Sequence, residues 1–200
     1  MIKNIILDFG DIFINLDKQA TAKAMRPFGF EQITPELHTL FKAYEKGDIS
    51  SLVFLDTVSK QFPKASRTEL IQAWNAILLD FPLYRLEFLE QLAQENTHRL
   101  FLLSNTNDIH IEFVKDQMGM TNYNRFKNAF EVFYLSYEMG MRKPDAEIFE
   151  FVLKENELRA SETLFVDDTK ENTDSAKALG ISVWNLKVGE EDITQLKSRL

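Results

Sequence analysis

Side chains that can bind a metal ion or a phosphate group stand directly after short apolar runs of this sequence. They are Asp8, Ser104, Asn105, Asp167 and Asp168. Lys143 lies in the stretch between these runs, ahead of an apolar helical pattern. If the apolar runs are parallel strands of one sheet, their carboxyl ends share one edge, where ligands bind in such sheets. The sequence therefore predicts one site that holds three carboxylates, one cation and short hydrogen-bonding side chains.

These residue types suit the hydrolysis of a phosphate ester. Three clustered carboxylates repel one another unless protons or a metal ion intervene, and hard oxygen ligands favour a cation such as Mg²⁺. Lys143 would add fixed positive charge, while Ser104 or Asn105 would donate hydrogen bonds to the phosphate. Asp8 is then left to attack phosphorus and form an aspartyl-phosphate, which splits one difficult hydrolysis into two easier displacements.

The apolar runs have the length and composition of strands that are buried on both faces. We expect strands at residues 4–7, 100–103, 130–135, 163–166 and 181–185. Helical patterns alternate with the later strands, and one of them is expected to end at Gly119 and another to hold Pro144 in its first turn. This repetition predicts an α/β fold with a Rossmann-like, doubly wound parallel sheet and right-handed crossovers.

The stretch between the first two strands is much longer than one crossover helix requires. It shows three amphipathic patterns, which begin at Thr34, at about Ser51 and at the capping box that runs from Ser66 to Glu69. Such helices can form a small bundle of their own. We therefore predict a core domain made of residues 1–15 and 83–200, with a helical cap inserted at residues 16–82.

The overall composition narrows the possible functions. A chain of 200 residues with 44% hydrophobic and 27% charged residues is expected to fold throughout. A formal charge of −8 and the lack of a basic cluster argue against nucleic acid as a partner. Because the chain has no cysteine, it offers neither disulfides nor thiolate ligands. The first apolar run is too short for a signal peptide or a membrane span, so we expect a cytoplasmic protein without membrane partners.

Four motifs in order resemble those of haloacid dehalogenase (HAD) superfamily phosphohydrolases. They are Ile-Ile-Leu-Asp-Phe-Gly-Asp-Ile at 5–12, Leu-Leu-Ser-Asn-Thr-Asn at 102–107, Gly-Met-Arg-Lys-Pro-Asp at 140–145 and Leu-Phe-Val-Asp-Asp at 164–168. The inserted helices resemble the family's C1-type cap, which closes over small substrates. Within the superfamily, the second and third motifs look most like those of sugar-phosphate phosphatases of the α-D-glucose-1-phosphate phosphatase type.

The resemblance implies a magnesium-dependent phosphatase that acts on a small phosphorylated metabolite, as a monomer or homodimer. It implies Asp8 as the nucleophile and Ser104, Asn105 and Lys143 around the transferred phosphate, with Lys143 also holding the nucleophile. It further implies that Asp8, the Gly10 main-chain carbonyl, Asp167 and Asp168 surround Mg²⁺. Asp168 would bind the ion directly and Asp167 through water.

The sequence departs from the family at one position. Most phosphatases of this superfamily carry a second aspartate two residues after the nucleophile, which protonates the leaving group, and here that residue is Gly10. Because a positioned acid contributes about 100-fold to 10,000-fold, turnover should be slower unless another group replaces it. Asp11 is a candidate, although strand-like alternation would point it away from Asp8. An anomeric sugar phosphate, whose leaving group is already fairly acidic, would need such an acid least.

Three other classes of protein compete with this interpretation. A haloacid dehalogenase shares the fold and the aspartate nucleophile but works without magnesium, and its fourth motif typically lacks the Asp167-Asp168 arrangement. A phosphometabolite-binding or regulatory protein with weakened turnover is favoured by Gly10. A phospho-receiver domain also gathers carboxylates around magnesium, but it is shorter, has no cap, and carries its acidic pair near the start of the chain.

Overall fold

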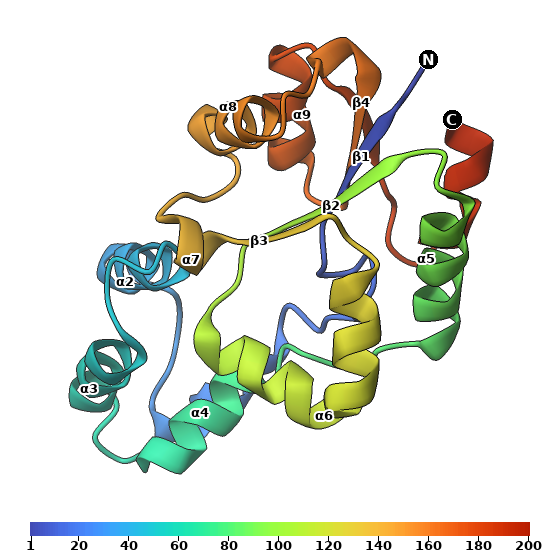
Figure 1. The fold of residues 1–200 in the computed structure, drawn as a ribbon. Helices are drawn as coiled ribbons and strands as arrows, with labels where there is room; N and C mark the ends of the chain where they lie inside the picture. Colours follow the sequence, from blue (N-terminus) through green and yellow to red (C-terminus); the bar gives the residue numbers. More distant parts are fainter.

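A parallel five-stranded sheet forms the centre of the computed structural model, which describes residues 1–200 (Figure 1). The strands are β1 (Asn4–Leu7), β2 (Arg99–Ser104), β3 (Val132–Leu135), β4 (Thr163–Asp167) and β5 (Ser182–Asn185). Their order across the sheet is β3-β2-β1-β4-β5, so the direction of winding reverses between β1 and β4. The expected doubly wound α/β fold is confirmed. In such a sheet, ligands bind at the carboxyl ends of the strands where the winding reverses.

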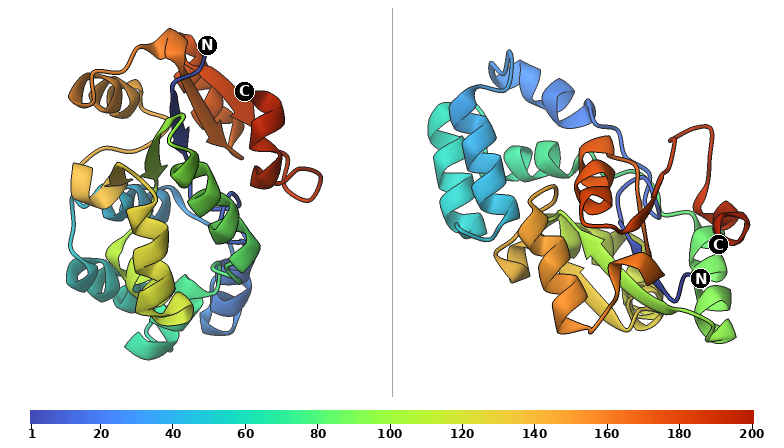
Figure 2. Two further views of the ribbon diagram at one scale, coloured as in Figure 1. Left: turned by 45° about the vertical axis from the view of Figure 1, so that its right-hand side comes forward. Right: turned by 90° about the horizontal axis from the view of Figure 1, so that it is seen from above.

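Helices cover both faces of the sheet because both faces are apolar. The first strand sends Ile5 and Leu7 to one face and Ile6 to the other, as the two-residue period of a strand requires. One face is covered by α5 (Leu83–Glu95), α6 (Asp108–Asn128) and the 3₁₀ helix η3 (Ile193–Arg199). The other is covered by α8 (Ala146–Glu155) and α9 (Lys170–Ala178) (Figure 2).

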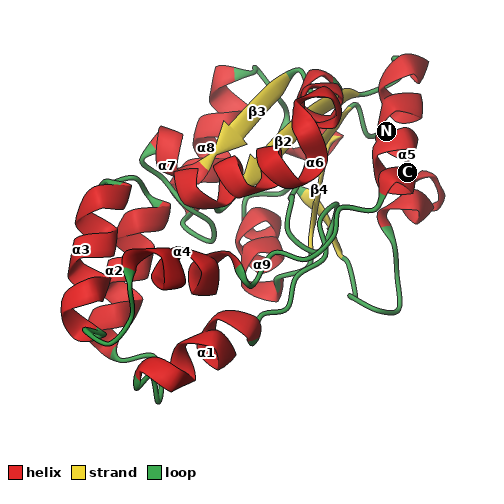
Figure 3. Ribbon diagram, turned by 90° about the horizontal axis from the view of Figure 1, so that it is seen from below, coloured by secondary structure: helices red, strands yellow, loops and turns green.

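Four helices between β1 and β2 pack around an apolar cluster of their own, to one side of the sheet (Figure 3). They are α1 (Ala20–Met25), α2 (Pro35–Glu45), α3 (Ser51–Gln61) and α4 (Arg67–Asn75), with the 3₁₀ turn η1 (Arg26–Phe28) after α1. Side chains of Thr34, Ser50 and Ser66 accept the hydrogen bonds that begin the last three. The domain boundaries at residues 16 and 82 stay a prediction, and we use "cap" below for these four helices.

Two chain segments connect the cap to the sheet, and they pair with each other. The main chain of Asn15 bonds to Asp80 and Leu79, and the Asp17 N–H donates to the Ile77 carbonyl at 2.9 Å. Leu16 and Leu78 face each other across this short antiparallel ladder. The ladder brings residues that follow the first motif to the wall of the site.

One local expectation was confirmed and another was wrong. The helix that begins at Asp108 is interrupted at Gly119, whose φ of 72° and ψ of 147° are not helical, and a second helical stretch follows it at once, so that α6 as a whole ends at Asn128. The apolar side chains of Tyr123 and Phe126 hold the second half against the sheet. Pro144 lies before α8 rather than in its first turn, because Asp145 is the N-cap residue. Five short elements were not expected, namely α1, η1, α7 (Ser136–Met139), η2 (Ala160–Glu162) and η3. None of the helices is both long and apolar enough to span a membrane.

Candidate active site

The carboxylates of the first and fourth motifs meet at the point where the winding of the sheet reverses. Asp8 directly follows β1, and Asp167 is the last residue of the neighbouring strand β4. Oxygen atoms of Asp8, Asp167 and Asp168 lie within 4.8 Å of one another. The structure thus brings together the three carboxylates that the sequence placed at one sheet edge.

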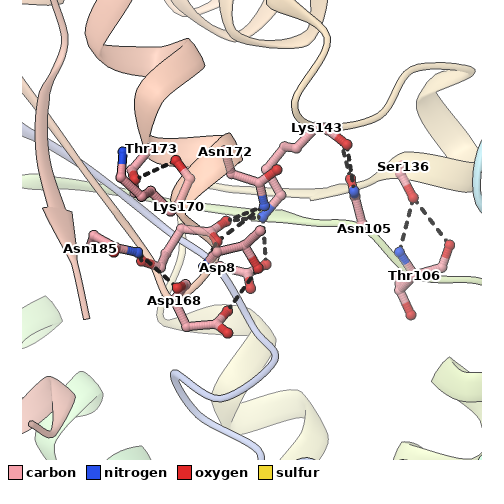
Figure 4. Close-up of polar contacts among 12 residues, drawn as sticks. Asp8, Asn105, Thr106, Ser136, Lys143, Asp168, Lys170, Asn172, Thr173 and Asn185 are labelled. Atoms are coloured by element: carbon pink, nitrogen blue, oxygen red, sulfur yellow. Dashed lines mark hydrogen bonds and ion pairs between the residues drawn. The ribbon is translucent and has the colours of Figure 1, made fainter. Parts of the chain in front are cut away.

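Lys143 lies between two of these carboxylates. Its Nζ is 2.7 Å from Asp8 Oδ1 and 2.7 Å from Asp167 Oδ2, and the residue is only 1% exposed (Figure 4). Burial works to lower the pKa of Lys143, but the negative charges of Asp167 and Asp8 outweigh it and raise the pKa. The ammonium group is therefore a fixed positive charge beside Asp8, the residue that the sequence predicts as the nucleophile.

Asn105 fixes the main chain that carries this lysine. Its Nδ2 donates to the Lys143 carbonyl at 2.8 Å, and its Oδ1 accepts from the Lys143 N–H at 2.9 Å. Because both ends of the amide bond to the main chain of Lys143, the Asn105 side chain positions this lysine, while the Asn105 main-chain N–H donates to no main-chain acceptor. A cavity lies at this edge of the sheet, and the side chain of the neighbouring Ser104 lines it.

Two further hydrogen bonds hold the loop after β2 in place. The Thr106 N–H donates to Ser136 Oγ at 3.0 Å, and this hydroxyl donates to the Glu45 carbonyl of the cap at 2.6 Å. Ser136 is the first residue of α7, so the phosphate-facing loop, the third strand and the cap are tied together at one hydroxyl. No sequence pattern pointed to Ser136, because a lone serine at a helix start is common.

Burial is the largest influence on the protonation of the nucleophile. It raises the pKa of Asp8 from 3.8 to about 7 when no metal is bound, even though Lys143 acts in the opposite direction, and the charge of Asp167 adds to the rise. Near neutral pH the metal-free protein therefore holds Asp8 in both protonation states. Only the carboxylate can attack phosphorus.

This protonation predicts a rate that depends jointly on pH and Mg²⁺. The reaction needs ionised Asp8, so kcat/KM should rise with pH and reach half of its plateau near pH 7 at low Mg²⁺. A cation beside the carboxylate favours its ionised form, so saturating Mg²⁺ should move the midpoint to lower pH. Rate profiles from pH 5 to 9 at two Mg²⁺ concentrations would measure this shift. A midpoint that is independent of Mg²⁺ would contradict the placement of Asp8 beside the ion.

The donor groups fit a hard divalent cation. Asp8 and Asp168 both line the cavity with carboxylates. The Gly10 carbonyl accepts no main-chain hydrogen bond and is free for a metal ion. Asp167 differs, because it is fully buried and its oxygens already accept from Thr169, Asn172 and Lys143. All of these donors are oxygen atoms, as Mg²⁺ prefers.

A second lysine, which the sequence did not point to, contacts the acidic site. Lys18 Nζ lies 2.5 Å from Asp168 Oδ2 and 3.0 Å from Asp11 Oδ2. It comes from the segment that leads from the first motif into the cap and lines the cavity. No motif contains Lys18, and only the path of this connecting segment brings it here.

Asp11 does not reach the cavity. It adopts a left-handed backbone conformation with φ of 54°, and its Oδ1 accepts from the Leu16 N–H at 3.0 Å while Oδ2 pairs with Lys18. The residue lines a separate hollow, whose walls also include Asp80 and Arg85. The structure therefore leaves the position of the leaving-group acid without a carboxylate.

The space beside Gly10 is filled by an apolar side chain. A Cβ atom built on Gly10 would lie 3.9 Å from Asp8 Oδ2, so a side chain there would stand next to the nucleophile. The same Cβ would be only 2.8 Å from Leu16 Cδ1. Leu16 thus takes up the room that an acid at this position would need.

The catalytic cavity has a volume of about 500 Å³, and its walls come from both the core and the cap. Arg142 and Glu45 form a salt bridge of 2.9 Å across these walls. His110 is a second link, because its Nε2 contacts the Trp74 carbonyl at 3.2 Å and its Nδ1 contacts Asn107 at 3.2 Å. Burial lowers the pKa of His110 to about 4, so this histidine is neutral and joins the cap to the core.

The fold and this site define a hydrolase of the haloacid dehalogenase-like class. The model of that family matches residues 20–180, and the chain belongs to this family. A D-ribitol-5-phosphate phosphatase of Bacteroides thetaiotaomicron is 29% identical over 96% of this chain and 95% of its own.

Solved structures show the same architecture. A HAD family enzyme of Bacteroides thetaiotaomicron in complex with magnesium and inorganic phosphate is 34% identical, with a TM-score of 0.79 over 96% of this chain and 97% of its own. A predicted HAD-like hydrolase from Porphyromonas gingivalis is 26% identical, with a TM-score of 0.83 over 100% of this chain and 98% of its own.

Proposed function

We propose that this protein is a magnesium-dependent phosphatase that hydrolyses a small phosphomonoester through an aspartyl-phosphate at Asp8. The observation that carries the proposal is the position of Asp8 in the wall of a cavity, where it pairs with the buried ammonium of Lys143 and lies close to the carboxylates of Asp167 and Asp168. The solved relative that holds magnesium and inorganic phosphate supports the same chemistry.

Each step of the reaction can be assigned to groups of this chain. An Asp8 oxygen attacks phosphorus, a new O–P bond forms, and the bond from phosphorus to the substrate oxygen breaks with its electron pair on the leaving alcohol. The Lys143 ammonium, the Ser104 hydroxyl and the Asn105 N–H face the phosphoryl oxygens as donors. Water then attacks the aspartyl-phosphate and releases inorganic phosphate, and Asp8 is regenerated.

The metal ion would be held directly by Asp8, the Gly10 carbonyl and Asp168, and by Asp167 through a water molecule. When bound, Mg²⁺ neutralises charge on the phosphoryl oxygens. Asp167 serves chiefly to hold Lys143 and to accept hydrogen bonds from Asn172, because its oxygens face protein donors.

Two types of substrate fit the proposal: a polyol or sugar phosphate with an ordinary alcohol as leaving group, and an anomeric sugar phosphate. The whole-length relative named D-ribitol-5-phosphate phosphatase favours a polyol or sugar phosphate. The motifs resemble those of α-D-glucose-1-phosphate phosphatases, and the missing acid beside Asp8 favours an anomeric phosphate whose leaving group needs little protonation. We propose a sugar or polyol phosphate, with water as the proton donor to the leaving oxygen.

Phosphate release from a panel of metabolites, measured with and without Mg²⁺, tests the proposal. Magnesium-dependent release supports the phosphatase. Halide release from a 2-haloacid without metal would replace it with a dehalogenase, and tight binding of a phosphometabolite without turnover would replace it with a binding protein. Asp8 and Asp168 line the same cavity, which favours magnesium-dependent phosphate release.

Installing an acid beside the nucleophile is expected to speed the reaction. In a Gly10→Asp, Leu16→Ala double variant the new side chain has room next to Asp8, so release from D-ribitol 5-phosphate should rise by at least about 100-fold. The gain should be smaller with α-D-glucose 1-phosphate, whose leaving group is more acidic. Initial rates for both esters measure the difference, with Leu16→Ala alone as the control. Equal rates in the double variant and its control would show that proton transfer does not limit turnover.

A further inference from the structure

A second cavity lies inside the cap, and its chemistry differs from that of the catalytic cavity. It has a volume of about 240 Å³, and 13 of the 17 residues that line it are hydrophobic. Its walls include Leu37 of α2, Val58 of α3 and Leu70 of α4, all of them buried. We call this space the cap hollow.

A hollow of this size is unusual inside a small helical bundle. Protein interiors pack about as densely as organic crystals, with few voids larger than a water molecule. Apolar cavities of roughly 150 Å³ stay dry and take up benzene. The cap hollow is larger than that and most of its wall is apolar, so it suits an apolar ligand.

The cap hollow adjoins the catalytic cavity. The two spaces share four wall residues, Lys18, Glu45, Ile77 and His110. The indole of Trp74 lines the hollow and stacks on the His110 ring, with 5.3 Å between ring centroids and 22° between planes. A molecule whose phosphate faces Asp8 therefore has an apolar compartment beside it, on the cap side.

The ends of the hollow are also defined. On the side of the catalytic cavity the hollow is bounded by the charged residues Lys18 and Glu45, which line both spaces. Ile33, which also lines the hollow, is 56% exposed, so the hollow reaches the protein surface at this residue. Aromatic rings of Phe41, Phe54 and Trp74 contact one another between these ends and give the space a rigid wall.

We propose that the cap hollow binds an apolar alkyl or aryl group that belongs to the same molecule as the phosphate held at Asp8. The inference rests on the proposed phosphatase function for the phosphate end. It extends the substrate class from short polar esters to esters whose alcohol carries an apolar group.

A series of n-alkylphosphonates tests the proposal because these compounds keep an anionic head group and are not hydrolysed. Dissociation constants of the methyl, butyl, hexyl and octyl compounds would be measured by calorimetry in the presence of Mg²⁺. Each buried methylene should tighten binding by about threefold to fourfold until the hollow is full. Equal affinities along the series would overturn the proposal.

A matched pair of variants on α3 locates the binding site. Val58→Phe places a larger side chain in the hollow, whereas Val53→Phe makes the same change at a residue that is 47% exposed and lines neither cavity. Val58→Phe should abolish the dependence on chain length and leave the affinity for methylphosphonate unchanged, while Val53→Phe should match the wild type. Identical behaviour of the two variants would refute the assignment. If Val58→Phe does not fold, Ala22→Leu fills the hollow from α1 and serves the same purpose.

A ligand without a phosphate separates this proposal from the proposed function. n-Hexanol should bind to the wild type and to Val53→Phe but not to Val58→Phe, whether or not the protein releases phosphate. Absence of hexanol binding to the wild type would count against the hollow as an apolar site. Failure of every phosphonate, methyl included, together with hexanol binding would instead refute the phosphate site at Asp8 and still support the hollow as a site for apolar groups.

Discussion

Replacing Asp8 with Asn is expected to abolish phosphate release while the fold is retained. The amide keeps the volume of the carboxylate but is not a nucleophile, so no aspartyl-phosphate can form. Lys143 keeps its other partner, Asp167, at 2.7 Å, which limits the structural damage. Release of phosphate at saturating substrate and Mg²⁺ is the measurement, and a thermal unfolding curve checks that the variant is folded.

Asp11→Asn is the matched control for this experiment. It makes the same chemical change three residues away, at a carboxylate that lies outside the catalytic cavity. Because a general acid contributes about 100-fold or more, Asp11→Asn should lower the rate by much less than that. A loss as large as that of Asp8→Asn would make Asp11 part of the chemistry, and a fully active Asp8→Asn would remove Asp8 as the nucleophile.

Replacing Lys143 with Met is expected to impair both turnover and stability. Removal of one fixed donor from a buried site typically lowers kcat by about 100-fold to 1,000-fold. The change also leaves Asp8 and Asp167 buried without their cation, and breaking a buried ion pair in this way costs about 3–5 kcal/mol. Chemical unfolding curves and rates of phosphate release would measure the two effects. An active variant as stable as the wild type would contradict the role of Lys143.

The pH dependence of that variant gives a second test. Without Lys143 the folded state should hold Asp8 at a pKa still further above that of the unfolded chain, because burial and the nearby charge of Asp167 oppose its ionisation. A raised carboxyl pKa means that the folded state binds more protons, so its free energy of unfolding should fall as pH rises through the folded pKa. Mg²⁺ should restore part of the stability above that pH, and Lys143→Arg, which keeps the charge, should show a smaller loss.

Much of the core could be predicted because its signals are local. Each strand is a short apolar run. The polar residues that follow several of these runs lie together, because the carboxyl ends of parallel strands share one edge of the sheet. Asp8, Ser104 and Asp167 could therefore be placed together from the sequence alone. Helix starts at Thr34 and Ser66 were equally accessible, because a cap residue acts within its own turn.

The rest could not be predicted because it depends on contacts between distant segments. The Lys18 ammonium reaches Asp168 only because the two connecting segments of the cap pair with each other. The orientation of Asp11 depends on one left-handed residue, and no sequence period reports it. The second motif identified Asn105 as a site residue. It did not show that the Asn105 side-chain amide would form hydrogen bonds with the main chain of Lys143. The cap hollow, similarly, is a packing property of helices whose apolar stripes predicted only a core.

One carboxylate at the start of α6 adds to the contacts that hold the cap over the site. Asp108 accepts a hydrogen bond of 2.5 Å from the Tyr44 hydroxyl and another from the Ser51 hydroxyl, and both hydroxyls belong to the cap. Hydrogen bonds to a charged group contribute only about 1.5–3 kcal/mol each, since water replaces them when they break. Such a clasp can therefore be released and remade in every catalytic cycle, and its release would free substrate and product to exchange with solvent.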